Sequence, residues 1–259
     1  MNKVARLGEQ ALVVLEGLGA FVRFALGILL RSSALLAKPA LWVRAMYQAG
    51  VLSLPIILVA GFFVGMVLAF QGFTTLVRFG AEQSLGIMVA LSLMRELGSV
   101  VSALLFAGRA GSSITAEIGL MKTTEQLSAM EMMAIDPMVQ VGLPRFWGAM
   151  LALPLLVVLF VAVAIVGAYV VGVLHLGVDA GVFWSQMQQG VDFYGDIFQG
   201  MLVKSIAFGW VVAAIAVYQG FNCTPTARGM SNATTKTVVL ASLAVLGLDF
   251  ILTAMMFGG

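Results

Sequence analysis

Four charged side chains lie inside long apolar segments, and they are the residues of this 259-residue chain best placed to do chemistry. Arg95 and Glu96 are neighbours in one segment, Lys204 lies near the start of another, and Asp249 lies near the middle of a third. Ionisable groups inside a membrane are costly and mark functional sites by default. Arginine or lysine can hold a phosphate, while surrounding Leu, Val, Met and Phe suit acyl chains. The pattern favours a lipid-binding site, with Gln71 as a further polar residue at the outer end of the first segment.

The same charges have a structural interpretation. Pairs such as Arg95–Asp249 and Glu96–Lys204 would hold helices together without contacting any ligand. Adjacent residues of a helix point about 100° apart, so Arg95 and Glu96 cannot pair with each other and also face one cavity. At least one of them must reach another helix or a bound ligand, and the sequence leaves both interpretations open.

A second candidate site is the polar segment 109–145, which interrupts the apolar sequence. Ser128 and Glu131 have the spacing of a capping box at a helix start, although a Ser and a Glu inside a helix would look the same. Asp136-Pro137 predicts a stop, because a residue before proline avoids the α region. A short polar helix carried by a membrane domain is typical of a docking element for a soluble partner. The candidate coupling residues are Glu117, Glu125, Met130, Glu131, Met133 and Asp136.

Motifs for other chemistry are missing from the sequence. There is no Gly-Lys dipeptide, hence no Walker A phosphate loop, and neither H-E-x-x-H nor G-x-S-x-G occurs. His175 is the only histidine and Cys223 the only cysteine, so we expect no metal site, no catalytic triad and no internal disulfide. The net charge of +2 indicates no nucleic-acid partner. The chain is therefore expected not to be an enzyme, with no cofactor of its own; if ATP powers it, another chain binds the nucleotide.

The elements that position these residues are predicted to be membrane helices. The chain is 61% hydrophobic and 10% charged, with a mean hydropathy of +1.05, far from the composition of a soluble domain. A spanning helix needs about 20 mostly apolar residues. The predicted fold is all-α and integral to the membrane, with five spans at about 51–71, 84–108, 146–174, 198–219 and 238–257.

Charge bias predicts the orientation. With the N-terminus in the cytoplasm, the inside segments hold 11 of the 14 Lys and Arg residues, the outside segments hold only Arg78, and Arg95 and Lys204 lie within spans. This places the C-terminus outside and the segment 109–145 in the cytoplasm. Aromatic residues at 183–184 and 193–194 suit an interfacial helix in the outside connection 175–197.

The N-terminal segment 1–44 is predicted to be separate from the five-helix domain 45–259. Its apolar residues follow helical spacing, while Glu9, Glu16 and Arg23 form a polar stripe on another face. This pattern predicts an amphipathic helix lying in the membrane interface and ending near Lys38. The alternative is a sixth, poorly apolar span whose charges face protein.

Several long motifs resemble one family. They are Ala90-Leu-Ser-Leu-Met-Arg-Glu-Leu-Gly98, Ala103-Leu-Leu-Phe-Ala-Gly-Arg-Ala-Gly-Ser112, Thr115-Ala-Glu-Ile-Gly119, Thr124-Glu-Gln-Leu-Ser-Ala-Met-Glu-Met-Met133 and Ser242-Leu-Ala-Val-Leu-Gly-Leu-Asp-Phe250. Together they resemble the MlaE-type permease family, over nearly the whole chain. One departure is Ser99, where the family often has proline, so a proline kink there is in doubt.

The resemblance implies a function and partners. It implies the permease subunit of a phospholipid ABC transporter in the bacterial inner membrane, which maintains outer-membrane lipid asymmetry. It also implies a homodimer, a cytoplasmic MlaF-type ATPase, an MlaB-type STAS protein bound through the ATPase, and a periplasmic MlaD-type MCE hexamer. In that arrangement residues about 123–135 form the coupling helix, the N-terminal segment forms the elbow helix, and phospholipid binds at the dimer interface.

Two other functions remain open from the sequence. An ion-coupled secondary transporter would use Arg95, Glu96, Lys204 and Asp249 as a relay, and it would need neither an ATPase nor a docking segment. No internal repeat is visible, which disfavours an inverted-repeat carrier. A membrane scaffold without transport is the third interpretation.

Overall fold

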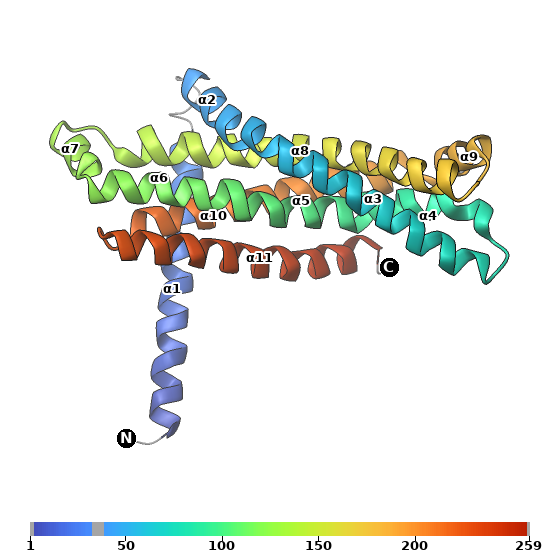
Figure 1. Ribbon diagram of the computed structural model, residues 1–259. Helices are drawn as coiled ribbons and strands as arrows, with labels where there is room; N and C mark the ends of the chain where they lie inside the picture. The colour runs from blue at the N-terminus through green and yellow to red at the C-terminus, as the bar shows by residue number, and fades with distance from the viewer. Residues whose placement is uncertain (1–2, 33–38, 258–259) are drawn as a thin grey trace.

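The computed structural model describes residues 3–32 and 39–257, and over these ranges the chain forms helices and no strand (Figure 1). Five helices are long and apolar enough to cross a membrane, which confirms the predicted fold class. They run over Ala40–Val77, Glu82–Thr123, Met138–His175, Phe193–Asn222 and Ala227–Met256. In chain order the elements are α1 (Lys3–Arg31), α2 (Pro39–Gly50), η2 (Val51–Ser53), α3 (Leu54–Val77), η3 (Glu82–Ser84), α4 (Leu85–Ser92), η4 (Leu93–Leu97), α5 (Gly98–Phe106), η5 (Ala107–Gly111), α6 (Ser112–Thr123), α7 (Gln126–Met132), η6 (Met138–Gly142), α8 (Leu143–Tyr169), η7 (Val170–His175), α9 (Ala180–Gly190), η8 (Phe193–Val203), α10 (Lys204–Asn222) and α11 (Ala227–Phe257).

The long helices extend beyond the predicted spans. The first begins in α2 at Pro39, inside the segment 1–44, and the second continues through Arg109 to the end of α6. The third already begins at Met138, so the segment 109–145 is mostly helix and only residues around α7 leave it. Hydropathy marks where apolar residues stop, whereas backbone hydrogen bonds carry a helix on past that point. The predicted end near Lys38 lies outside the described residues.

Five π-helical segments, η4 to η8, interrupt the long helices. A π turn inserts an extra residue, which breaks the regular hydrogen-bond ladder and is frequent at functional sites. Segment η4 contains Arg95 and Glu96 and ends two residues before Ser99. The second span is therefore irregular next to the position where the family often has proline, although this chain has a serine there.

Helix α8 lies at the centre of the bundle and packs on α2, α3, α5 and α10. Glycines bring α3 close to it. A Cβ built on Gly65 would lie 1.8 Å from the carbonyl oxygen of Ala164, and one on Gly61 would lie 2.9 Å from that of Phe160. The Gly61-x-x-x-Gly65 pattern thus permits the α3–α8 contact, because small residues let two backbones approach in a membrane.

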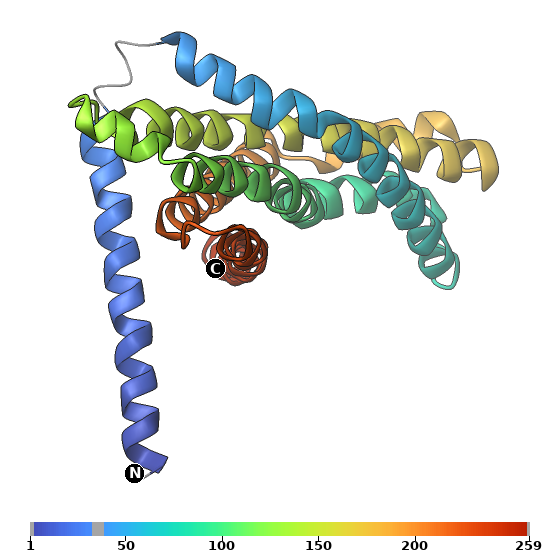
Figure 2. The same cartoon turned by 60° about the vertical axis from the view of Figure 1, so that its left-hand side comes forward.

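Helix α1 lies across the bundle, roughly perpendicular to the five long helices (Figures 1 and 2). Only its C-terminal part packs on the body. Phe21 and Phe24 contact the ring of Tyr218 edge-on, with centroids 5.5 and 5.3 Å apart, while Ala25 and Ile28 are buried. This orientation agrees with the predicted interfacial helix and not with a sixth span.

Two short helices mark the opposite ends of the bundle. Helix α7 lies at the end where α1 crosses, and α9 lies at the far end (Figure 1). Helix α9 is the predicted helix of the connection 175–197. Its N-terminus is capped by Asp179, whose carboxylate accepts from the backbone N–H of Val182 at 2.8 Å. The two candidate sites, the intramembrane charges and α7, therefore lie at different depths of one bundle.

Candidate functional site

Arg95 forms an ion pair that the sequence did not indicate. Its Nε donates to Oδ1 of Asp196 at 2.6 Å, which joins the π segments η4 and η8. The other oxygen of Asp196 accepts from the backbone N–H of Asp192 at 2.8 Å. The carboxylate is almost fully buried, with 1% of its side chain exposed, whereas 41% of the Arg95 side chain remains exposed. Arg95 is thus held by η8 while part of its side chain remains exposed.

Lys204 is enclosed completely. None of its side chain is exposed, and its ammonium donates to the carbonyl oxygen of Arg95 at 2.7 Å, to Oδ1 of Asp249 at 3.0 Å and to Oγ1 of Thr253 at 2.7 Å. An ammonium has three N–H donors, so these acceptors match its capacity. The contacts tie α10 to η4 and to α11. A buried charge is tolerated only when it is paired and hydrogen-bonded in this way.

The predicted pairs were therefore wrong in detail. Arg95 pairs with Asp196 instead of Asp249, and Lys204 pairs with Asp249 instead of Glu96. The prediction assumed regular α-helical direction around Arg95, but this residue lies in a π segment and faces η8. Asp196 falls within the predicted outside connection 175–197, because the fourth span was predicted to begin near residue 198, whereas the helix already begins at Phe193.

Glu96 and Gln71 are both exposed on the outside of the single chain. Within the described ranges Glu96 forms no ion pair. Gln71 lies at one end of an apolar groove of about 270 Å³ between α3 and the second long helix. The groove is lined by Phe63, Val64, Val67, Leu68, Gln71 and Leu97. Gln71 is the one polar residue among these, so the groove has an apolar length with a polar amide at one end.

The predicted cytoplasmic helix exists as α7, but it begins differently. Ser128 lies inside α7, so the capping-box interpretation was wrong and the mid-helix alternative is correct. The residue before the helix is Glu125, and α7 is bracketed by two left-handed residues, Glu125 and Ala134, both with φ of 58°. Non-glycine residues in this region are strained, and such strain gathers at functional sites.

The surface of α7 is apolar as well as acidic. Leu127 is buried and Met130 is partly buried against the core, so this face of α7 packs on the bundle. Met132 and Met133 are 84% and 63% exposed, and Glu131 is exposed beside them. Methionines form adaptable contact surfaces. The structure thus presents a projecting helix with flexible apolar side chains at its tip.

Two of the coupling candidates already have partners. Glu117 lies in α6, where its Oε2 accepts from Nε of Arg145 at 3.2 Å. Asp136 accepts from the backbone N–H of Met138 at 2.8 Å, which caps the third long helix. Its other oxygen lies 3.6 Å from a guanidinium nitrogen of Arg31. These contacts stabilise the ends of helices, so α7 itself is the better candidate for docking.

Sequence reasoning missed two residues as members of the charged site. Asp196 and Thr253 complete the charged network. Both come from helices that meet η4 and Lys204 only in the folded bundle, so no local pattern marks them. Within the described ranges, no group of three His, Cys, Asp or Glu side chains gathers as a metal site.

Comparisons with known proteins agree with these features. The model of the family described as permease MlaE matches residues 42–255. The chain is 52% identical over its whole length to the intermembrane phospholipid transport system permease protein MlaE of Haemophilus influenzae, of which it covers 98%. It is 33% identical to a probable ABC transporter permease of Rickettsia typhi, with 99% of this chain and 98% of that protein covered. The chloroplastic TRIGALACTOSYLDIACYLGLYCEROL 1 protein of Arabidopsis thaliana is 29% identical over 84% of this chain and 61% of that protein.

Proposed function

The chain belongs to the MlaE permease family, and we propose that it is the membrane subunit of an ABC transporter that moves phospholipids between its own membrane and a periplasmic lipid-binding partner. The Haemophilus relative, 52% identical over the full length, is named as an intermembrane phospholipid transport permease. Transport of this kind in the bacterial inner membrane maintains the lipid asymmetry of the outer membrane. The five spanning helices make the chain a multi-pass membrane protein.

The observation that carries the proposal is the groove bordered by Gln71 and Leu97. Its apolar side chains suit an acyl chain, and the amide of Gln71 at its end suits a headgroup. Arg95 is the cation best placed to meet a phosphate, because 41% of its side chain is exposed. Lys204 and Asp249 act by holding η4 in position, since the ammonium of Lys204 bonds to the backbone of Arg95. Glu96 is left to meet a cationic headgroup or a basic neighbour.

The role of the groove in lipid binding can be tested with a substitution that fills it with a larger side chain. Val67 lines the groove and Val59 lies outside it on the same helix, and their exposed fractions are 55% and 58%. We expect Val67→Trp to lower the phospholipid that co-purifies with the chain and the transfer rate of the reconstituted transporter. Val59→Trp should leave both unchanged, because its ring points into bulk lipid. Wild-type lipid content and transfer with Val67→Trp would contradict the groove's role.

ATP hydrolysis is proposed to take place on a separate cytoplasmic ATPase of the MlaF type, with an MlaB-type STAS protein bound to it and an MlaD-type MCE hexamer in the periplasm. Helix α7 supports this proposal, because it projects at the end of the bundle, with exposed Met132 and Met133 beside Glu131. The excess of Lys and Arg at this end supports a cytoplasmic location for it, with the C-terminus in the periplasm.

The permease is proposed to act as a homodimer that packs through α11. Val239, Leu243, Leu246 and Phe250 are at least half exposed, and they recur at intervals of four, three and four residues. This spacing places them on one stripe, as in helices that pack on each other. A second copy would cover the stripe next to Asp249.

The ion-coupled alternative gains no support. It required the four intramembrane charges to form a proton or ion relay. Within the chain, Lys204 is instead enclosed by three acceptors and Glu96 points outward. Membership of a permease family favours the ATP-driven transporter over both this carrier and a scaffold.

A further inference from the structure

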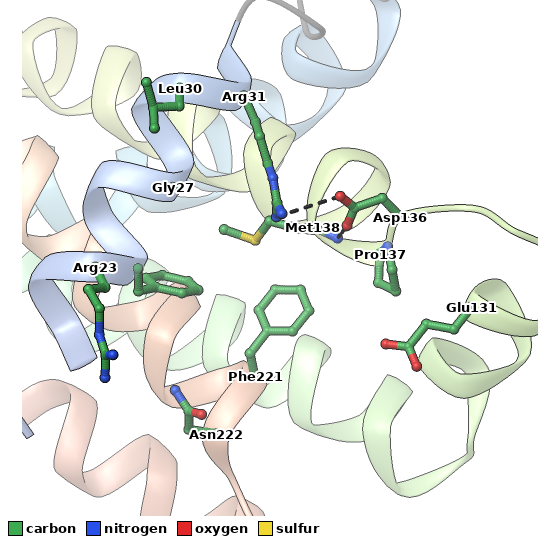
Figure 3. A pocket seen from close by; sticks show the side chains of 11 residues that line it. Arg23, Gly27, Leu30, Arg31, Glu131, Asp136, Pro137, Met138, Phe221 and Asn222 are labelled. Atoms are coloured by element: carbon green, nitrogen blue, oxygen red, sulfur yellow. Dashed lines mark hydrogen bonds and ion pairs between the residues drawn. The ribbon is translucent and has the colours of Figure 1, made fainter.

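A cavity of about 510 Å³ lies where α1 crosses the end of the bundle beside α7 (Figure 3). The cavity and the groove at Gln71 lie at opposite ends of the long helices. Its volume falls in the range of small-ligand sites, about 300–1,000 Å³. The side chains used below are those of Arg23 and Arg31 from α1, Glu131 from α7, Asp136 from the turn after it, and Phe221 from the end of α10.

The charged lining of this cavity is balanced, with two guanidinium groups and two carboxylates. Figure 3 shows Arg31 and Asp136 reaching toward each other from α1 and from the turn, with Glu131 on the side of the cavity formed by α7. The Arg31–Asp136 contact is long, 3.6 Å, and both side chains are about half exposed, at 55% and 43%. An exposed ion pair of this kind is weak, so a ligand with matching charges can replace it.

The matching ligand is a zwitterion. A guanidinium fork binds phosphate in preference to other anions, and a carboxylate accepts hydrogen bonds from an ammonium. A phosphate at the guanidinium of Arg31 and an ammonium near Glu131 would match these charges, while Arg23 lines the far side of the cavity with its guanidinium directed away from Arg31 (Figure 3). A purely anionic ligand would offer the two carboxylates no cation to pair with.

An apolar stripe on α1 adjoins the cavity. Val22, Leu26 and Leu30 recur every four residues and are 53%, 53% and 82% exposed, and Leu30 also lines the cavity. Helix α1 lies across the long helices (Figure 2), which is the orientation expected of an amphipathic helix whose apolar stripe lies in the membrane interface. A molecule with its headgroup in the cavity could therefore place acyl chains beside the stripe.

We propose that this cavity binds the phosphoethanolamine headgroup of a phospholipid in the leaflet at the α1 end of the bundle. Ethanolamine is favoured over choline, because a trimethylammonium group has no N–H to donate to Glu131. It is favoured over glycerol, because phosphatidylglycerol lacks the cation. The site is separate from the groove and does not depend on what the chain transports.

The test uses a photoreactive probe in the full chain in nanodiscs. Leu30 is replaced by p-benzoylphenylalanine, and the nanodiscs contain phosphatidylethanolamine, phosphatidylcholine and phosphatidylglycerol in equal amounts. Lipid adducts are counted by mass spectrometry. We expect ethanolamine adducts to be enriched roughly two- to fivefold over each other lipid, which corresponds to one partly exposed charge-assisted contact. Adducts that follow the bulk composition would overturn the proposal.

Two glycines supply a matched pair of blocking variants. A Cβ on Gly27 or on Gly19 meets no atom within 4 Å, but only Gly27 lines the cavity. Gly27→Leu should abolish the enrichment, while Gly19→Leu should keep it; equal behaviour of the two would count against the site. Glu131→Lys should shift the preference toward phosphatidylglycerol, and an unchanged preference would also overturn it.

Discussion

Removing the carboxylate of Asp249 should destabilise the bundle more than removing the ammonium that it neutralises. At 3.0 Å and an effective dielectric constant of about 20, the gross attraction between Lys204 and Asp249 is about 5.5 kcal/mol. Asp249→Ala leaves a cation with no exposed surface, so we expect a loss of about 3 kcal/mol in the free energy of unfolding. Lys204→Met leaves a carboxylate that is 21% exposed and can take water, so its cost should be about 1.5 kcal/mol.

The double variant Lys204→Met/Asp249→Ala removes both charges and should cost only about 1 kcal/mol, because an apolar replacement of a buried pair is often nearly neutral. The coupling energy of the cycle is then about 3.5 kcal/mol in magnitude. Unfolding by sodium dodecyl sulfate in lipid bicelles, followed by circular dichroism, measures all four proteins. Thr253→Val gives a comparison for the loss of one neutral acceptor, about 1 kcal/mol. Additive single effects, or an Asp249→Ala cost below that of Thr253→Val, would refute the reasoning.

Three further predictions concern docking, orientation and assembly. Glu131→Lys should weaken binding of the ATPase at least about tenfold in a pull-down, since α7 projects at the end of the bundle proposed to face the ATPase. Glu82→Lys at the far end of the bundle should leave binding unchanged. Equal binding by the two variants would exclude α7 as the docking element. The orientation can be tested by labelling single cysteines in a chain whose one native cysteine is replaced by serine. Glu16→Cys on α1 should react with an impermeant maleimide only from the cytoplasmic side, and Glu82→Cys only from outside. Labelling of Glu16→Cys from outside would contradict the proposed orientation. Leu243→Cys on α11 should give disulfide-linked dimers in membranes and Leu155→Cys on α8, exposed at 53%, should not; equal cross-linking would disprove an α11 interface.

The spans could be predicted from the sequence because hydropathy is a local property. Each of the five apolar runs became a long helix, and the amphipathic pattern of the N-terminal segment became a helix lying across the others. The ends were harder to predict. Past Arg109 the sequence turns polar, yet the helix continues to Thr123, because its polar residues face neighbouring helices. There Thr115 donates to the carbonyl oxygen of Ala216 at 2.9 Å, and Lys122 donates to that of Phe221 at 2.5 Å.

The partners of the intramembrane charges could not be predicted, because they depend on tertiary packing. The sequence correctly singled out Arg95, Lys204 and Asp249 as residues that need compensation. It could not supply Asp196, which is 101 residues from Arg95. The π segments also made the directions of side chains unpredictable, because an extra residue in a turn rotates every later side chain relative to a regular helix.

The charged residues form one connected network and not two separate ion pairs. Asp196 holds the side chain of Arg95, and the backbone carbonyl of the same arginine accepts from Lys204, which pairs with Asp249. The network therefore runs from η8 through η4 and α10 to α11, beside the stripe proposed to pack on a second copy. Since Arg95 is the member with a side chain left open, its position depends on contacts at both of its ends. A change in packing at α11 that moved Asp249 would alter the support of Lys204, and through it the backbone that carries the proposed phosphate-binding side chain.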